Sequence, residues 1–92
     1  MIIEFDPIKN AKNIAERSLS FNRAGDFDFE TSKAWQDTRI EYPEARFIAI
    51  GYLDNRLHVL VFCVIRGGIR VISFRKANKR EGVTHGFTLT RN

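Results

Sequence analysis

The clearest pattern in the chain is a series of apolar runs in its second half, separated by pairs of turn-forming residues. The runs at 46–53, 56–65 and 69–75 are rich in β-branched and aromatic residues, which favours strands. Asp54-Asn55 separates the first two runs and Gly67-Gly68 the last two. Both pairs suit tight hairpin turns because their residues adopt positive φ angles readily. The pattern therefore predicts three consecutive antiparallel strands.

Alternation along the third run predicts which side chains share a face of the sheet, because successive side chains of a strand point to opposite sides. Ile72 and Phe74 fall on one face, which we expect to be the core. Val71, Ser73 and Arg75 fall on the other, which we expect to be half-exposed.

The start of the chain predicts an amphipathic helix from Asp6-Pro7 onward. The carboxylate of Asp6 can accept free amide hydrogens of the first turn, and proline suits the first helical position. Apolar residues then recur at helical spacing, which predicts a stripe packed against the core. The stripe consists of Ile8, Ala11, Ile14, Ala15 and Leu19.

Weaker patterns fill the segments on either side of the three strands. Ser20 can cap a short second helix over residues 21–27, and residues 29–38 are expected to form a further strand. A proline and two glutamates make 39–45 a loop, and 77–85 favours a short helix. The tail at 87–92 carries no clear pattern. The expected fold class is α+β: N-terminal helices on a mostly antiparallel sheet of three or four strands, with a short C-terminal helix.

Composition narrows the class of protein. A chain of 92 residues that is 43% hydrophobic is expected to form a single packed domain, residues 1–92. Cys63 is the only cysteine, so no internal disulfide can form. No apolar run approaches the roughly 20 residues that span a bilayer, and the N-terminus lacks a signal pattern. We therefore expect a cytoplasmic protein that does not contact a membrane.

The basic residues are concentrated in the second half of the chain. Residues 1–46 carry seven Lys or Arg against nine Asp or Glu, whereas residues 47–92 carry eight against two. The stretch 66–81 alone holds six cations and no acid before Glu81. Such a surface suits nucleic acid, an anionic membrane or an acidic protein, and charge alone does not choose among them.

Several motifs, taken in order, resemble one family. The chain resembles the BrnT family, small RelE-like toxins of bacterial type II toxin-antitoxin systems. The resemblance runs over residues 2–81. It rests on Glu4-Phe5-Asp6-Pro7, Lys9, Asn13, Ser20-Phe21, Ala24, Arg46-Phe47, Ile50-Gly51, Arg70-Val71-Ile72-Ser73-Phe74-Arg75-Lys76-Ala77 and Arg80-Glu81.

The resemblance implies a function and a set of partners. It implies a RelE-like fold and an endoribonuclease that cuts RNA without a metal and inhibits translation. It also implies a ribbon-helix-helix antitoxin that holds the toxin inactive, with operator DNA bound only through the complex of the two. A homodimer stays open as a further assembly.

Metal-independent cleavage of RNA needs a base for the ribose 2′-hydroxyl, cations for the charge on the phosphorane, and an acid for the leaving oxygen. Arginine supplies only the cation, because its pKa above about 12 keeps it protonated. We therefore expect Arg46, Arg70 and Arg75 to stabilise charge. The candidate proton carriers are Glu81 and His58, with Glu44 and a lysine of lowered pKa also considered.

Each candidate has a plainer alternative. Arg46 can pair with Glu44 or Glu41, Glu81 can pair with a neighbouring cation, and His58 can be a structural histidine on the face of Leu60 and Phe62. Trp35 can stack on a base or belong to a core or dimer interface. The expected RNA contacts are Lys76, Lys79 and Arg80, whose alternative is a solvated basic strand end and helix start.

No cluster of Cys and His has metal-ligand spacing, and no glycine-rich loop precedes a helix, so we expect neither a metal nor a nucleotide cofactor. Two other functions remain open. One is a non-catalytic module that binds RNA or docks an acidic protein, and the other is a protein adaptor without nucleic-acid contact.

Overall fold

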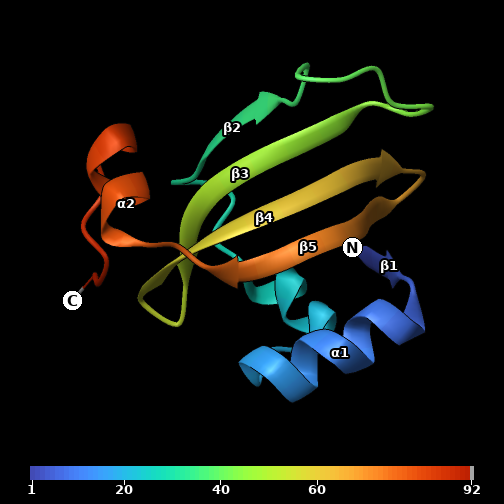
Figure 1. Ribbon diagram of the computed structural model, residues 1–92, viewed down its shortest axis with the longest axis horizontal. Helices are drawn as coiled ribbons and strands as arrows, with labels where there is room; N and C mark the ends of the chain where they lie inside the picture. Colours follow the sequence, from blue (N-terminus) through green and yellow to red (C-terminus); the bar gives the residue numbers. More distant parts are fainter. Residues whose placement is uncertain (92) are drawn as a thin grey trace.

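Three antiparallel strands form the centre of the sheet, as the hairpin pattern predicts. The computed structural model describes residues 1–91 and pairs β3 (Arg46–Leu53), β4 (Arg56–Ile65) and β5 (Gly68–Lys76) in this order (Figure 1). Asp54 and Asn55 have φ angles of 49° and 63°, as a tight turn between β3 and β4 requires.

The second turn lies one residue earlier than predicted. Gly67 has a φ of 79°, but Gly68 already belongs to β5 and pairs with Ile65. The turn residues are therefore Arg66 and Gly67. Gly68 is required for a different reason: a Cβ built there would lie 1.9 Å from the carbonyl oxygen of Ile2 on the neighbouring strand.

Two short strands complete the sheet. β1 (Ile2–Phe5) lies parallel to β5, and β2 (Lys33–Gln36) lies antiparallel to β3. The sheet thus has five strands in the order β1-β5-β4-β3-β2, and it is mixed. The α+β class is confirmed, but the prediction of three or four strands is wrong because β1 was not recognised. β2 is also shorter than the predicted segment 29–38.

Helix α1 (Pro7–Arg17) begins where predicted, but Leu19, which follows the helix, is the one member of the predicted apolar stripe that is buried. Oδ1 of Asp6 accepts a hydrogen bond from the amide of Ile8 at 2.9 Å. The side chain of Ile8 is nevertheless 80% exposed, and Ile14 is 45% exposed. The buried residue of α1 is Asn13, so the stripe prediction is wrong for this helix.

Asn13 is buried because its side chain ties α1 to the rest of the fold. Its amide nitrogen donates to the carbonyl oxygens of Leu19, at 2.9 Å, and Phe74, at 3.0 Å. Its amide oxygen accepts from Arg17 at 2.7 Å. The hydrogen-bonding capacity of a buried amide is thereby largely satisfied.

The side of the core that faces away from the sheet is supplied mainly by the segment after α1. The predicted second helix is a 3-10 helix, η1 (Phe21–Asp26), which packs against β1 and β5. It lies on the same side of the sheet as α1 (Figure 1). The core on this face contains Leu19, Phe21, Ala24, Phe27, Ala49, Leu53, Leu60, Phe62, Ile69, Val71 and Phe74.

The other face of the sheet is only partly covered. Helix α2 (Lys79–His85) stands at one end of it, beside the chain's C-terminal tail (Figure 1). Phe87 and Leu89 of the tail pack on a second apolar cluster, and the Leu57 amide donates to the carbonyl of Leu89 at 2.8 Å. The last tail residue, Asn92, lies outside the described residues. None of the helices in residues 1–91 has the length and apolar character needed to cross a membrane.

A bulge in β5 changes which side chains share a face. Phe62 pairs with Val71, and Val61 pairs with Ser73, so Ile72 is an extra residue in the strand. Val71 is 2% exposed and belongs to the core with Phe74. The predicted grouping of Val71 with Ser73 and Arg75 is therefore wrong.

Candidate active site on the open sheet face

Three of the predicted arginines lie on one face of the sheet, in two cross-strand rows. Arg46 and Arg70 occupy one row, and Arg75 occupies another. Residues that pair directly across strands share a face, and so do residues two apart along a strand. We call this the open face. Each of its rows takes one residue from β3, one from β4 and one from β5. The rows are Arg46, Cys63 and Arg70; Ile48, Val61 and Ser73; and Ile50, Val59 and Arg75.

The two arginine rows lie at different positions along the strands. They are separated by four residues along β3, which corresponds to about 13 Å at the rise of a strand. The structure therefore places Arg46, Arg70 and Arg75 on one face, in two rows about 13 Å apart along the strands.

At one end of the open face, Arg70 and Arg46 have different partners. Nε of Arg70 donates to Glu4 at 2.8 Å, and its Nη1 donates to Glu44. These carboxylates raise the pKa of Arg70 above its ordinary value, chiefly through the hydrogen bond with Glu4. The Arg46 guanidinium instead lies over the ring of Tyr42, 4.3 Å from the ring centroid. Glu44 therefore pairs with Arg70 and leaves Arg46 without a carboxylate partner among residues 1–91.

At the other end, Arg75 and Glu81 form a two-bonded ion pair. Nη1 and Nη2 of Arg75 donate to the two carboxylate oxygens of Glu81 at 2.8 and 2.7 Å. Glu81 also accepts from the amide of Asn78, as part of the capping box that begins α2. These hydrogen bonds, with that from Arg75 the strongest, lower the pKa of Glu81 to about 2. The carboxylate is therefore ionised at neutral pH and is a weak base.

A small cavity of about 210 Å³ adjoins this ion pair. Its floor is apolar, and its rim carries two aromatic rings that stack on each other: Trp35 of β2 and His85 of α2, with ring centroids 4.7 Å apart at an interplanar angle of 19°. Trp35 is 38% exposed, so it is neither a core residue nor fully solvated. The cavity is lined by Trp35, Arg39, Ile48, Ile50, Val59, Val61, Arg75, Glu81 and His85.

The predicted RNA contacts continue from this end of the sheet. Lys76 is the last residue of β5, and Lys79 and Arg80 form the first turn of α2. All three are exposed. Glu81 does not pair with Lys79 or Arg80, as one alternative proposed, because Arg75 holds it.

A comparison with protein families places residues 5–81 in one family model, that of the ribonuclease toxin BrnT of type II toxin-antitoxin systems. The chain belongs to the BrnT family. The match includes Arg46, Arg70, Arg75 and Glu81 but ends before His85. A comparison with curated proteins finds no match.

The remaining candidate of this BrnT-family chain, His58, lies on the opposite face of the sheet. It shares that face with Leu60 and Phe74, and its ring centroid lies 5.4 Å from that of Phe74. His58 is 4% exposed, and its Nδ1 lies 2.7 Å from the carbonyl oxygen of Arg56. The structure therefore separates His58 from Arg46 and Arg70.

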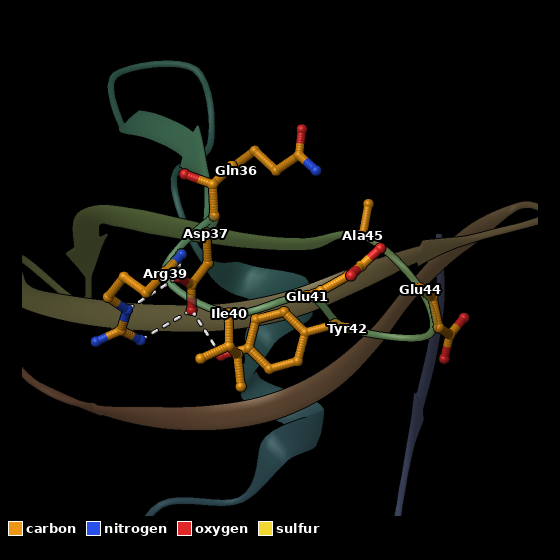
Figure 2. A pocket seen from close by; sticks show the side chains of 9 residues that line it. Gln36, Asp37, Arg39, Ile40, Glu41, Tyr42, Glu44 and Ala45 are labelled. Carbon is orange, nitrogen blue, oxygen red and sulfur yellow. Dashed lines mark hydrogen bonds and ion pairs between the residues drawn. The ribbon is translucent and has the colours of Figure 1, made fainter.

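A second polar cluster organises the loop between β2 and β3. The carboxylate of Asp37 accepts two hydrogen bonds from the Arg39 guanidinium, at 2.9 and 2.8 Å, and one from the Tyr42 hydroxyl at 3.1 Å. Figure 2 shows both side chains turned toward Asp37 inside a cavity of about 420 Å³. Arg39 in particular keeps the pKa of Asp37 well below its usual range. This loop positions the Tyr42 ring under Arg46 and Arg39 at the rim of the open face.

Sequence reasoning gave little weight to two residues of this face. From the sequence alone, His85 ranks below His58 and Glu81 as a candidate, and Arg39 falls in the predicted loop 39–45. The only signal for His85 was its place near the C-terminus of a short predicted helix. The chain nowhere groups three His, Cys, Asp or Glu side chains within residues 1–91 in a way that would hold a metal ion.

Proposed function

We propose that this BrnT-family chain is an endoribonuclease that cleaves RNA on the open face without a metal and thereby inhibits translation. The observation that carries the proposal is the meeting of Arg75, Glu81, His85 and Trp35 at one cavity. The family's description as a ribonuclease toxin supports the reaction class. The RelE-like character of the fold belongs to the same proposal, and the five-stranded α+β sheet is compatible with it.

The arrangement suggests a division of chemical roles. Arg75 stabilises the charge that develops on the phosphorane, and Arg39 at the rim adds to it. Glu81 orients Arg75 instead of taking the proton, since a carboxylate with a pKa of about 2 is a poor base. His85 is the proton carrier, because its imidazole ring at the cavity can accept a proton on one nitrogen: it takes the proton of the ribose 2′-hydroxyl and gives it to the leaving 5′-oxygen. Trp35 stacks on a base.

The other cations extend the RNA surface beyond the cavity. Arg46 has no carboxylate partner among residues 1–91 and is free to contact a phosphate. Lys76, Lys79 and Arg80 contact further phosphates at the other end. Arg70, held by two carboxylates, contributes less to binding.

A type II toxin family implies an antitoxin partner. We propose that this partner is a ribbon-helix-helix protein that covers the open face, and that operator DNA binds only to the complex. The resemblance of the sequence motifs to the BrnT family supports a ribbon-helix-helix protein as the antitoxin. Co-purification of the chain with the product of a neighbouring reading frame, followed by loss of RNA cleavage, is the expected result.

The test of the reaction uses purified protein and total RNA in the presence of EDTA. Wild-type protein should cut RNA, Arg75→Ala and His85→Gln should cut at least about 100-fold more slowly, and Lys9→Gln should match wild type. Lys9 is exposed on α1, away from the cavity, and so controls for the loss of a positive charge. No cleavage by wild-type protein, or equal cleavage by all variants, would overturn the proposal.

One observation favours the non-catalytic alternative: Glu81 already occupies both terminal nitrogens of Arg75. If the face only binds RNA, wild-type protein will retard labelled RNA without cutting it, and its expression without a partner will not arrest growth.

A further inference from the structure

A second cavity lies on the face of the sheet opposite the proposed RNA-cleavage site. It has a volume of about 600 Å³, within the range of small-molecule sites. The end of α1, η1, the turn after β3, the start of β4 and the end of β5 surround it. Its lining residues are Arg17, Ser18, Leu19, Arg23, Leu53, Asp54, Arg56, His58, Arg75 and Lys76.

The charge of this cavity is strongly positive and largely uncompensated. Within the part of the chain that the structure describes, Asp54 is the only acid that lines the cavity, and both of its carboxylate oxygens accept hydrogen bonds from Arg23 at 2.8 Å. Among residues 1–91, Arg17, Arg56 and Lys76 have no carboxylate partner. Three cations therefore face one space without a carboxylate partner from residues 1–91.

Two of these cations are fixed in place by other hydrogen bonds. Nη1 of Arg17 donates to the side chain of buried Asn13 at 2.7 Å. Arg56 donates to the carbonyl oxygens of Leu57 at 2.6 Å and Ala77 at 3.0 Å. A guanidinium held by its neighbours binds an anion at a smaller cost in side-chain entropy than a free one.

His58 contributes a polar atom from the buried wall. Its Nδ1 must carry the hydrogen, because the carbonyl oxygen of Arg56 can only accept. Its Nε2 has no hydrogen-bond partner among residues 1–91. Every fully buried side-chain nitrogen and oxygen of these residues has a hydrogen-bond partner. Because Nε2 has none, it is not fully buried, and it must be accessible from the cavity that His58 lines. Burial, and next the nearby charges of Arg56 and Lys76, lower the pKa of His58.

We propose that this cavity is a binding site for the phosphate group of a nucleotide. Arg17, Arg56 and Lys76 neutralise the phosphate, and the His58 ring, once it is protonated on both nitrogens, donates from Nε2 to one of the phosphate oxygens. The apolar walls formed by Leu19 and Leu53 leave room for a ribose or a base. A dianion matches three cations and a protonated imidazole ring better than a single carboxylate does.

The phosphate has two sources, free nucleotide or RNA. Arg75 lines both this cavity and the one on the open face, so the two sites adjoin at the end of β5. An RNA strand cut on the open face can therefore place a terminal or flanking phosphate in the second site.

The test is a titration with inorganic phosphate, followed by the NMR signals of the His58 ring. Phosphate should shift these signals and raise the pKa of His58, which a purely structural histidine would not show. The double variant Arg17→Gln/Lys76→Gln should bind phosphate at least about ten-fold more weakly. Lys9→Gln/Lys12→Gln, which removes the same charge from exposed positions of α1, should bind as wild type does.

Further arms separate the two sources. Uridine 5′-monophosphate and a short RNA with and without a 5′-phosphate are titrated in the same way. Tighter binding of the mononucleotide than of either RNA identifies a free nucleotide, and dependence on the 5′-phosphate identifies an RNA end. Unchanged His58 signals, or equal phosphate affinity in the two double variants with folding verified by thermal denaturation, would overturn the proposal. The phosphate titration requires no cleavage, so it is independent of the nuclease test.

Discussion

Replacing Glu81 with Gln separates the two roles that this residue can have on the open face. The substitution removes the negative charge that holds Arg75, yet glutamine can still accept the amide hydrogen bond of the capping box. The helix start should therefore survive. If Glu81 only orients Arg75, its loss frees a guanidinium for RNA, and if Glu81 is the base, its loss removes the reaction.

The expected magnitudes follow from the geometry of the pair. The pKa of Glu81 falls from 4.5 to about 2, which corresponds to an upper limit of about 3 kcal/mol. The side chain of Arg75 is 37% exposed, so screening by solvent reduces this to about 1 kcal/mol of unfolding free energy. RNA affinity near 0.1 M salt should rise about three- to ten-fold, because the Arg75 guanidinium no longer pairs with residue 81 and can bind a phosphate of the RNA.

The stability difference should also depend on pH. The folded-state pKa of Glu81 lies below its ordinary value, so the ion pair stabilises the fold fully above pH 4.5 and is lost as the pH falls toward about 2. Urea unfolding of wild type and Glu81→Gln should accordingly converge over this window. A constant difference between them would contradict the assigned pKa.

RNA binding and cleavage are measured on the same variant by fluorescence anisotropy and single-turnover kinetics. We expect tighter binding, a steeper dependence on salt and a cleavage rate reduced by about ten-fold, because Arg75 is less well oriented. Glu16→Gln, which removes an exposed carboxylate of α1, is the matched control. A loss of about 100-fold or more, with unchanged binding, would refute the reasoning and make Glu81 the base.

Two further predictions concern the fold that supports the face. Asn13→Ala should lower the unfolding free energy by about 2–4 kcal/mol, measured in urea, because the carbonyls of Leu19 and Phe74 lose their donor. An unchanged midpoint would show that water replaces the amide. Gly68→Ala should separate β1 from β5, because its Cβ would lie 1.9 Å from the oxygen of Ile2. Faster hydrogen exchange confined to β1 and the start of β5 is the expected signature, and wild-type exchange rates would contradict it.

The central hairpins could be predicted because their information is local. Asp54-Asn55 supplies two residues at positive φ between two apolar runs, and β3 and β4 begin and end where the runs do. The signal for the start of α1 is equally local, since Asp6 and Pro7 both act within the first turn of the helix. Signals of this kind depend only on neighbouring residues, so a sequence displays them in full.

The elements that sequence reasoning missed depend on distant partners. β1 is a strand because Ile2 to Phe5 pair with β5, whose residues lie far along the chain. The stripe on α1 predicted burial of Ile8, but a hydrogen bond from Asn13 to the carbonyl of Phe74 fixes the helix with Asn13 inward. Periodicity cannot reveal that one polar contact decides which side of a helix faces the sheet.

The bulge at Ile72 explains why the candidate site was placed only in part. Arg70 and Arg75 are separated by an odd number of positions, so strict alternation puts them on opposite faces. The extra residue reverses the alternation within β5, and both arginines reach the open face. The same reversal turns Lys76 toward the face of His58, since the two residues pair directly. One inserted residue thus supplies a cation to each side of the sheet at the end of β5. The two cavities adjoin at this end of β5, where both are lined by Arg75.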